Sequence, residues 1–467
     1  MKFANRHKEL ERLGRLAKSR TASVAVIWGR RRVGKTRLLL EWTDRNRGIY
    51  FVADESAPSI QRKFFSLAIE RAIPGFAGVE YPDWLSLFLR LARDAVQKKW
   101  RGPLVIDELP YLIAGSPELP SVLQKFIDHE AKKARLILVL CGSSQRMMQG
   151  AILDESAPLY GRADELIKLS PIAIGYMKQA LKLKTPRAVV EAYALWGGVP
   201  RYWELAERVG GSLFENVDRL VLDPMGPLSE EPHRLLLEES PSVMHLRPIL
   251  DAIGLGAHRL SEIGGRIGEP VTSLTRSIER LIELDLIQRE IPYSMDPENS
   301  KKTLYKIKDP FLRFWFKMVA PRRSFLSQVS TSTRNQWFKE LLPFLVSTIW
   351  EELCRQAIPA LSQRWESLYE QAGRFWQSQG PEWDALAQSS NGSHFLIGEA
   401  KWTEKKPTPS WISQSIQELK NKGIPPVKRR PDTKLHYALF IPEKPKSLQL
   451  PPDVRLVEAK EIIAVLR

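Results

Sequence analysis

The sequence predicts an α/β protein made of several domains. At 467 residues the chain is longer than one hydrophobic core normally supports. A short β-branched strand at residues 24–28 runs straight into a glycine-rich loop and then an amphipathic helix at 37–42. Two more apolar strands, at 104–106 and 136–141, end in acidic or polar residues. Strands that alternate with helices are typical of α/β domains.

Composition excludes several classes of protein. Apolar residues make up 43% and charged residues 27%, which indicates a globular chain and not a disordered one. Apolar runs are far shorter than the ~20 residues that cross a bilayer, and no secretory signal is visible. The two cysteines form neither a disulfide framework nor a metal-spaced pair. A reducing cytoplasm is the expected location.

Positive charge is concentrated near the start of the chain. Lys and Arg number 70 against 54 Asp and Glu, for a net charge of +16. Residues 1–50 hold fourteen of the bases and four of the acids. This concentration suits a polyanion, either nucleotide phosphates or nucleic acid. A basic surface that only keeps the protein in solution is the alternative, and charge does not decide between them.

The glycine-rich loop after the first strand has the Walker A pattern, Gly29-Arg-Arg-Arg-Val-Gly-Lys-Thr36. Its glycines let backbone N–H groups surround phosphate oxygens, and the helix N-terminus adds partial positive charge. We expect Lys35 to reach the β- and γ-phosphates and the Thr36 hydroxyl to bind Mg²⁺. The residues expected to contact the nucleotide are Gly29, Arg30, Arg31, Arg32, Val33, Gly34, Lys35, Thr36 and Arg37.

The second strand ends in two acids, Asp107 and Glu108. An acid at the tip of a buried strand beside such a loop can hold Mg²⁺ through water, the Walker B role. The next carboxylate is placed to polarise an attacking water as general base. Lys35, Asp107 and Glu108 are therefore the predicted catalytic residues. The alternative is a solvated acidic turn after a strand.

The third strand runs into Gly142-Ser143-Ser144-Gln145. A polar residue at this point can sense the γ-phosphate. Ser143 can equally cap the following helix. The sequence leaves both interpretations open.

Six motifs in order carry a family resemblance. They are Phe3-x-Asn5-Arg6-x-x-Glu9-Leu10, Gly29-Arg-Arg-Arg-Val-Gly-Lys-Thr36, Asp107-Glu-x-Pro-Tyr111, Gly142-Ser-Ser144, Leu159-Tyr-Gly-Arg162 and Gly197-Gly-Val-Pro200-Arg-Tyr202. Together they resemble the archaeal and bacterial ATPase family allied to the AAA+ and STAND nucleotide switches. The resemblance covers nearly the whole chain.

The resemblance implies a P-loop NTPase core with a five-stranded parallel sheet. It places Asn5 and Arg6 near the adenine, and Pro200 on the nucleotide from a helical lid. Arg162 is implied as a γ-phosphate contact, with a structural salt bridge as the alternative.

Downstream of the lid the pattern indicates a winged helix-turn-helix. Three short amphipathic helices are followed by two extended segments around a polar turn. These elements are expected at 247–253, 260–267, 271–284, 286–292 and 303–307. The third helix turns Arg276 and Arg280 outward, so it can enter the major groove. A pure protein-interaction module is the alternative.

An aromatic segment at 309–316 is expected to be a hinge into the C-terminal domain. Its aromatic side chains are expected to pack between domains, with a base-stacking platform as the alternative.

The last part of the chain contains a second candidate site. Glu351 lies on a predicted helix around 345–361, Asp384 on a strand, and Glu399 and Lys401 two residues apart on the next strand. This order resembles the PD-(D/E)xK nuclease fold, in which the carboxylates hold Mg²⁺ and the lysine activates water. Trp383 stands where that family usually has isoleucine, and it is expected to cover the metal site.

These inferences predict four domains. They are the ATPase core at 1–166, the helical lid at 167–239, the winged helix at 240–320 and a restriction-endonuclease-like α/β domain at 325–467. The expected function is an ATP-binding and ATP-hydrolysing switch that uses Mg²⁺ and is coupled to a nuclease-like domain. Double-stranded DNA is the expected partner, with protein partners or self-association through the lid and winged helix also open. A non-enzymatic ATP-gated scaffold or transcriptional regulator with an inactive nuclease-like domain is the alternative.

Overall fold

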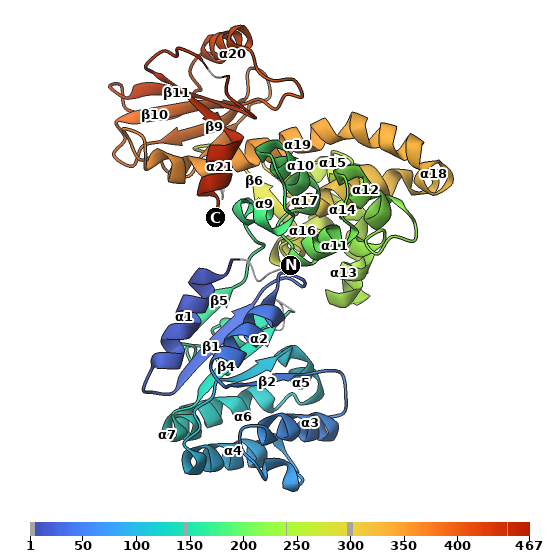
Figure 1. Ribbon diagram of the computed structural model, residues 1–467, viewed down its shortest axis with the longest axis vertical. Coiled ribbons are helices and arrows are strands. Elements are labelled where there is room, and N and C mark those ends of the chain that lie inside the picture. Colours follow the sequence, from blue (N-terminus) through green and yellow to red (C-terminus); the bar gives the residue numbers. More distant parts are fainter. Residues whose placement is uncertain (1–4, 144–147, 240, 297–301, 446) are drawn as a thin grey trace. The chain divides into compact units, whose positions relative to one another are not determined.

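The computed structural model describes residues 5–143, 148–239, 241–296, 302–445 and 447–467. The chain divides into two compact units, residues 5–171 and residues 172–467 (Figure 1). Across these described ranges, no helix is both long enough and apolar enough to span a membrane.

The first unit is built on the predicted parallel sheet. Its five strands run in the order β2-β3-β4-β1-β5, and every neighbouring pair is parallel. The strands are β1 (Ser23–Trp28), β2 (Ile49–Val52), β3 (Leu104–Asp107), β4 (Ile137–Gly142) and β5 (Glu165–Lys168). Nearly all residues of β1, β3 and β4 are buried, because the faces of a parallel sheet are covered by helices.

The helices of this unit alternate with the strands. They are α1 (His7–Lys18), α2 (Lys35–Arg45), α3 (Pro58–Glu70), α4 (Trp84–Lys98), α5 (Leu109–Gly115), α6 (Leu119–Lys125) and α7 (Lys132–Ala134). An aromatic cluster joins α3 and α4, where Phe65 contacts Trp84 and Phe88 edge-on at 5.7 and 5.8 Å. This core packs α3 against α4 and beside β2.

The second unit begins with short helices. They are α9 (Met177–Ala180), α10 (Pro186–Trp196), α11 (Pro200–Val209), α12 (Leu213–Val217) and α13 (Glu231–Glu239). Three more follow, α14 (Arg247–Gly254), α15 (Leu260–Ile267) and α16 (Val271–Glu283), close to the predicted bounds. The two predicted extended segments form an antiparallel pair, β6 (Ile287–Glu290) with β7 (Leu304–Ile307).

The aromatic segment at 309–316 lies inside the second unit and not at an edge of it. It forms α17 (Pro310–Phe314) and the first residues of η7 (Trp315–Val319). Phe311 is fully buried, with its ring 4.4 Å from that of Tyr202 and 6.3 Å from that of Trp196. These side chains are packed core and offer no face for base stacking, and the expected hinge between domains stays a prediction.

The C-terminal part contains a mixed sheet beside one long helix. The sheet order is β12-β11-β10-β9-β8, from β8 (Gly373–Phe375), β9 (Trp383–Gln388), β10 (His394–Ala400), β11 (Lys434–Ile441) and β12 (Val454–Glu458). The helices are α18 (Arg323–Gln328), α19 (Thr331–Ser362), α20 (Pro409–Asn421) and α21 (Ala459–Val465). Helix α19 is longer than predicted, because it continues through Pro343 and Pro359. As predicted, β9 and β10 are antiparallel.

Candidate functional site

The loop between β1 and α2 turns sharply, as the Walker A pattern predicts. Gly34 has φ 94° and Arg32 φ 69°, which turns the backbone sharply before α2 begins at Lys35. A Cβ on Gly29 would lie 2.4 Å from the Leu169 carbonyl oxygen. The close approach of β1 to the segment after β5 therefore requires glycine at position 29.

Lys35 is buried, with 5% of its surface exposed. Its Nζ donates to the carbonyl oxygens of Gly29 at 2.8 Å and Arg30 at 3.2 Å. Burial lowers the pKa of this ammonium, and Cys141, Glu108 and Asp107 partly offset that effect. A buried ammonium that has only carbonyl partners fits a site that receives phosphate oxygens.

Asp107 is fully buried at the end of β3 and brings the two nucleotide motifs together. Its Oδ2 accepts from Thr36 Oγ1 at 2.9 Å and from Tyr50 Oη at 2.5 Å, and its Oδ1 accepts from the Glu108 N–H at 2.9 Å. Burial, reinforced by Asp107, raises the pKa of Tyr50, so Tyr50 acts as a donor. The hydroxyl and carboxylate expected to share Mg²⁺ are therefore adjacent.

Glu108 is held by the residue at the end of β4. Ser143 donates from Oγ to Oε1 at 2.5 Å and from its N–H to Oε2 at 3.2 Å. Glu108 itself has φ 54°, an unusual backbone conformation for glutamate at the start of α5. Ser143 thus contacts the predicted general base, a role that neither sequence-based interpretation included. Ser144 and Gln145 lie outside the described residues.

Arg6 braces the phosphate loop in this structure. Its Nη2 donates to the carbonyl oxygens of Val33 at 2.7 Å and Ser170 at 2.8 Å, and its Nη1 pairs with Glu9 at 3.2 Å. The side chain is buried, and that burial lowers its pKa. Asn5 beside it is half-buried with φ 69°. The expected adenine contacts of both residues stay predictions.

Arg162 forms a salt bridge with Asp128, which is the structural role that the sequence left open for it. It contacts both carboxylate oxygens of Asp128, with its Nη2 2.9 Å from Oδ2. Within the loop, Arg31 Nη2 donates to Tyr111 Oη at 3.2 Å, Arg30 is buried and Arg37 is exposed. Pro200 is the first residue of α11 in the second unit, and its contact with nucleotide stays a prediction.

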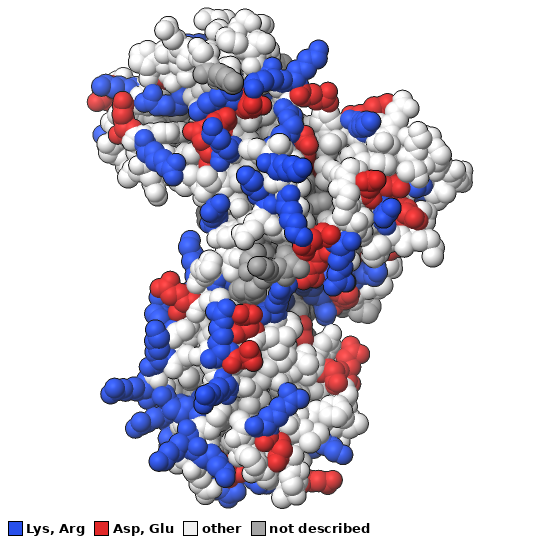
Figure 2. Space-filling model, viewed as in Figure 1, with Lys and Arg blue, Asp and Glu red and all other residues white. Residues whose placement is uncertain are grey.

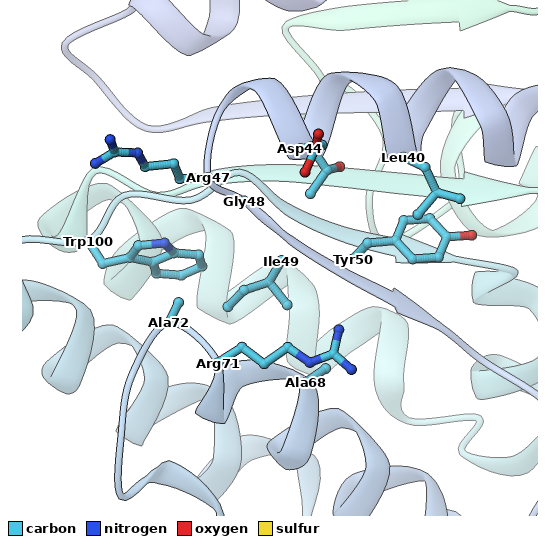
Figure 3. Close-up of a pocket in the computed structure, with 11 residues that line it drawn as sticks. Leu40, Asp44, Arg47, Gly48, Ile49, Tyr50, Ala68, Arg71, Ala72 and Trp100 are labelled. Atoms are coloured by element: carbon cyan, nitrogen blue, oxygen red, sulfur yellow. The ribbon is translucent and has the colours of Figure 1, made fainter.

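Tyr50 is a site residue that sequence reasoning missed. It also lines a pocket of about 550 Å³ between α2, β2 and α3. Figure 3 shows Arg71 extending beneath Ile49 and Tyr50, while Arg47 points away at the other end. The only signal in the sequence was a tyrosine within a short apolar strand, which is commonly a core residue. Tyr50 therefore both lines this pocket and donates a hydrogen bond to Asp107.

The C-terminal carboxylates predicted to form a site are brought together. Burial, followed by the neighbouring Asp384, raises the pKa of Glu351 to about 7. Burial, followed by Glu399, raises the pKa of Asp384. Asp384 Oδ2 also accepts from the Ala400 N–H at 2.9 Å, which ties β9 to the end of β10. The three acids therefore interact electrostatically, as the sequence predicted.

Glu399 is already paired with lysines. Lys422 Nζ lies 2.6 Å from its Oε2, and Lys401 Nζ lies 3.4 Å from its Oε1. Among the residues that the structure describes, no three His, Cys, Asp or Glu side chains are arranged to hold a metal ion. A cation between these carboxylates would have to compete with Lys422, which the sequence analysis did not place at the site.

Trp383 belongs to the core of the C-terminal sheet. Its ring packs against Phe375, with ring centres 5.8 Å apart, and 2% of the residue is exposed. Buried Leu386 and Phe395 belong to the same apolar cluster. These contacts give the tryptophan a packing role, and the expected metal-site cover stays a prediction.

Arginines that the sequence did not single out surround Glu351. Arg355 Nη1 donates to the Asp384 carbonyl oxygen at 2.8 Å and lies 3.9 Å from Glu351 Oε2. Arg374 pairs with Glu382 and also lowers the pKa of Glu351 electrostatically. The candidate site is therefore a mixed network of acids and bases.

Two ranges of the chain match known protein families, and the first range includes the whole first unit. Residues 3–205 match a family described as an ATPase domain predominantly from Archaea, and residues 315–412 match archaeal and bacterial proteins of unknown function. The uncharacterized protein MJECL04 of Methanocaldococcus jannaschii is 28% identical over 410 residues, which are 86% of this chain and 88% of that protein.

Of two solved structures that match, the first is similar in fold. The Walker-type ATPase PABY2304 of Pyrococcus abyssi gives a TM-score of 0.53 at 21% identity, covering 68% of this chain and 96% of that one. The ORC2 protein of Aeropyrum pernix, solved in ADPNP–ADP complexes, gives 0.48 at 16% identity, covering 71% and 95%. Residues 3–205, which span the first unit, therefore match an ATPase-domain family, and the parallel sheet with its glycine loop has the P-loop ATPase fold. This match supports an ATPase activity for the chain.

Replacing Glu351 by glutamine should reduce the sensitivity of the fold to rising pH. A raised pKa near 7 means that the native state holds this proton more tightly than the unfolded chain. The stability that it contributes is complete below the unfolded pKa and is lost as pH rises through the folded pKa. A rise from 4.5 to about 7, at 1.36 kcal/mol per unit, makes the loss at most about 3 to 4 kcal/mol.

Melting midpoints of wild type and Glu351→Gln at about pH 5 and about pH 8 test this. The wild type should lose more than the variant, while Glu340→Gln, an exposed site on the same helix, should behave like wild type. Equal losses for wild type and Glu351→Gln would show that the buried acid does not titrate in this range.

Proposed function

We propose that the protein is a cytoplasmic switch that binds and hydrolyses ATP with Mg²⁺ and docks to double-stranded DNA. The observation that carries the ATPase part is the hydrogen bond of Thr36 to Asp107 beside buried Lys35. Residues 167–239 would act as the helical lid, 240–320 as a winged helix, and 325–467 as a nuclease-like domain.

The residues of the P-loop support a specific division of labour. Lys35 would exchange two carbonyl partners for the β- and γ-phosphate oxygens and stabilise the charge that develops there. Thr36 and Asp107 are the residues that would hold Mg²⁺, which supplies charge neutralisation when bound. Tyr50 and the Glu108 N–H keep the Asp107 carboxylate oriented.

Glu108 is the proposed base, and Ser143 is its positioning residue. The two hydrogen bonds from Ser143 hold both carboxylate oxygens at the carboxyl end of β4. A carboxylate fixed there can accept a proton from a water aligned with the γ-phosphate. Ser143 would thereby hold the Glu108 carboxylate near the γ-phosphate without contacting the nucleotide itself.

Charge on the first unit supports DNA docking. The loops that lead into β1, β2, β3 and β4 carry Lys and Arg at the end of the sheet opposite to the nucleotide. We call this set the amino-end surface: Lys18, Arg20, Arg45, Arg47, Lys98, Lys99, Arg101, Lys132, Lys133 and Arg135. Figure 2 shows Lys and Arg gathered on this unit. A cluster of this density suits a phosphate backbone.

Helix α16 supports the winged-helix assignment. Leu274, Ile278 and Leu281 are buried, while Arg276 is exposed and Arg280 half-exposed. Arg280 also pairs with Glu283 at 3.0 Å, a surface contact of small energy. The apolar stripe holds the helix in place and leaves a polar face for a DNA groove or a protein partner.

The C-terminal sheet is proposed to dock DNA without cutting it. Lys422 and Lys401 neutralise Glu399, which reduces its affinity for a cation. An active Mg²⁺- or Mn²⁺-dependent nuclease is the second candidate, favoured by the mutual proximity of Glu351, Asp384 and Glu399.

Two substitutions test the ATPase assignment. Lys35→Ala should weaken ATP binding by at least about tenfold, because the phosphate charge loses its ammonium. Glu108→Gln should keep ATP binding and lower turnover by about a hundredfold, because it removes only the base. Equilibrium binding of a fluorescent ATP analogue and phosphate release measure the two effects.

The control for the base is Glu55→Gln, an exposed glutamate of the same unit. It should hydrolyse ATP like wild type. Equal turnover by Glu108→Gln and wild type would remove Glu108 from the mechanism and leave the nucleotide site intact.

The affinity for duplex DNA should fall steeply as the salt concentration rises. If several phosphates are neutralised, a plot of log affinity against log salt concentration should have a slope of several units. Arg276→Ala with Arg280→Ala should lower affinity for many duplex sequences alike. Lys98→Ala with Lys99→Ala tests the amino-end surface, and Lys178→Ala with Lys339→Ala, exposed lysines elsewhere, is the control. Fluorescence anisotropy at several salt concentrations measures all four proteins. If one of the two double variants binds DNA as tightly as wild type, the surface that carries its two substitutions does not contact DNA.

Cleavage assays with Mg²⁺ and Mn²⁺ separate the two C-terminal candidates. Docking without cleavage predicts that wild type and Asp384→Ala leave duplex DNA intact and hydrolyse ATP equally. Metal-dependent cleavage by wild type that is lost in both Asp384→Ala and Lys401→Ala would contradict the docking proposal and identify an active nuclease.

A further inference from the structure

The second unit contains a pocket of about 430 Å³ that borders the carboxylate network. Four segments of the chain form its walls: residues 253–262 of α14 and α15, 304–317 around β7 and α17, 344–351 of α19, and 374–382 after β8. Its size is within the range of small-molecule sites. Glu351 is the residue that this pocket shares with the carboxylates.

The charged lining of the pocket is predominantly basic. It consists of Arg259, Lys306, Arg313, Lys317, Arg374, Glu262, Glu351 and Glu382, together with His258. Four of the five bases have a carboxylate partner, namely Glu262 for Arg259, Glu290 for Lys306, Glu352 for Arg313 and Glu382 for Arg374. Only Lys317 has no carboxylate partner in the part of the chain that the structure describes.

Lys317 is half-buried in this wall. Its Nζ lies 3.8 Å from the centre of the Phe344 ring, a cation–π contact. Burial lowers its pKa, and nearby Arg313 lowers it further. A lysine that is partly removed from water beside another cation is poised for an anion, which would restore its charge balance.

Three lining residues also have buried N–H donors without an acceptor among the described residues. They are Arg313 Nη1, Arg374 Nε and Trp376 Nε1. Buried donors are normally paired, and these three keep hydrogen-bonding capacity that no described residue uses. Planar guanidinium groups beside an ammonium suit the oxygens of phosphate.

We propose that this pocket binds the phosphate ester of a nucleotide, either free or at the 5′ end of a DNA strand. Lys317, Arg313 and Arg374 would contact the phosphate, and apolar residues such as Phe344 and Leu345 would contact the sugar or base. The inference goes beyond the proposed function, because neither ATP hydrolysis nor duplex docking requires this pocket.

The experiment uses the full-length Lys35→Ala protein, so that the P-loop does not contribute to binding. Calorimetry would measure AMP, a 5′-phosphorylated DNA hexanucleotide, and the same hexanucleotide with a 5′ hydroxyl. We expect a phosphorylated probe to bind, and Lys317→Met to weaken it about tenfold, because methionine keeps the apolar stem and removes the charge. Lys317→Arg should restore most of the affinity. Lys339→Met, an exposed site on α19, should change nothing.

A second variant guards against a folding defect. Trp376→Phe removes the Nε1 donor and keeps an aromatic ring, so it should weaken the same probe several-fold with an unchanged melting midpoint. Binding of AMP identifies a free nucleotide as the ligand, and binding of the 5′-phosphorylated strand alone identifies a strand end. The proposal is overturned if neither phosphorylated probe binds. It is also overturned if Lys317→Met and Trp376→Phe both bind as tightly as the parent. ATP turnover is not measured, so these results are independent of the ATPase assignment.

Discussion

The proposed nucleotide site depends on the hydrogen bonding of one buried carboxylate, that of Asp107. Asp107 has no exposed surface and would be costly to bury without partners. Thr36, Tyr50 and the Glu108 backbone together donate three hydrogen bonds to it. These donors come from three different elements, α2, β2 and the start of α5. The same contacts that satisfy Asp107 therefore fix the phosphate loop against the carboxyl end of the sheet.

A parallel sheet makes this arrangement possible, because the carboxyl ends of its strands meet at one edge. β3 supplies Asp107 at this edge, Ser143 directly follows β4, and β1 leads into the phosphate loop. The opposite edge carries the amino-end surface. The first unit thus separates a compact phosphate site from a broad basic surface, and one sheet organises both.

Much of the first unit could be predicted from sequence, because its signals are local. The apolar strand, the glycines and Lys35-Thr36 lie within about a dozen consecutive residues. The partners of Asp107 and Glu108 could not be predicted, because Tyr50 and Ser143 reach them only through the order of the strands. Arg6 also donates to the carbonyl oxygens of Val33 and Ser170, two contacts far away in sequence that no motif indicates. The C-terminal acids were predicted to converge, but Lys422, which follows α20, was missed because no motif includes it.

A crystal structure with Mg²⁺ and a non-hydrolysable ATP analogue tests the central claim most directly. We predict that Lys35 Nζ leaves the Gly29 and Arg30 carbonyl oxygens and contacts the β- and γ-phosphates. We also predict that Mg²⁺ lies next to the Thr36 hydroxyl on the side of Asp107. A bound nucleotide that leaves Lys35 on the Gly29 carbonyl, or Mg²⁺ held away from Thr36 and Asp107, would contradict this claim.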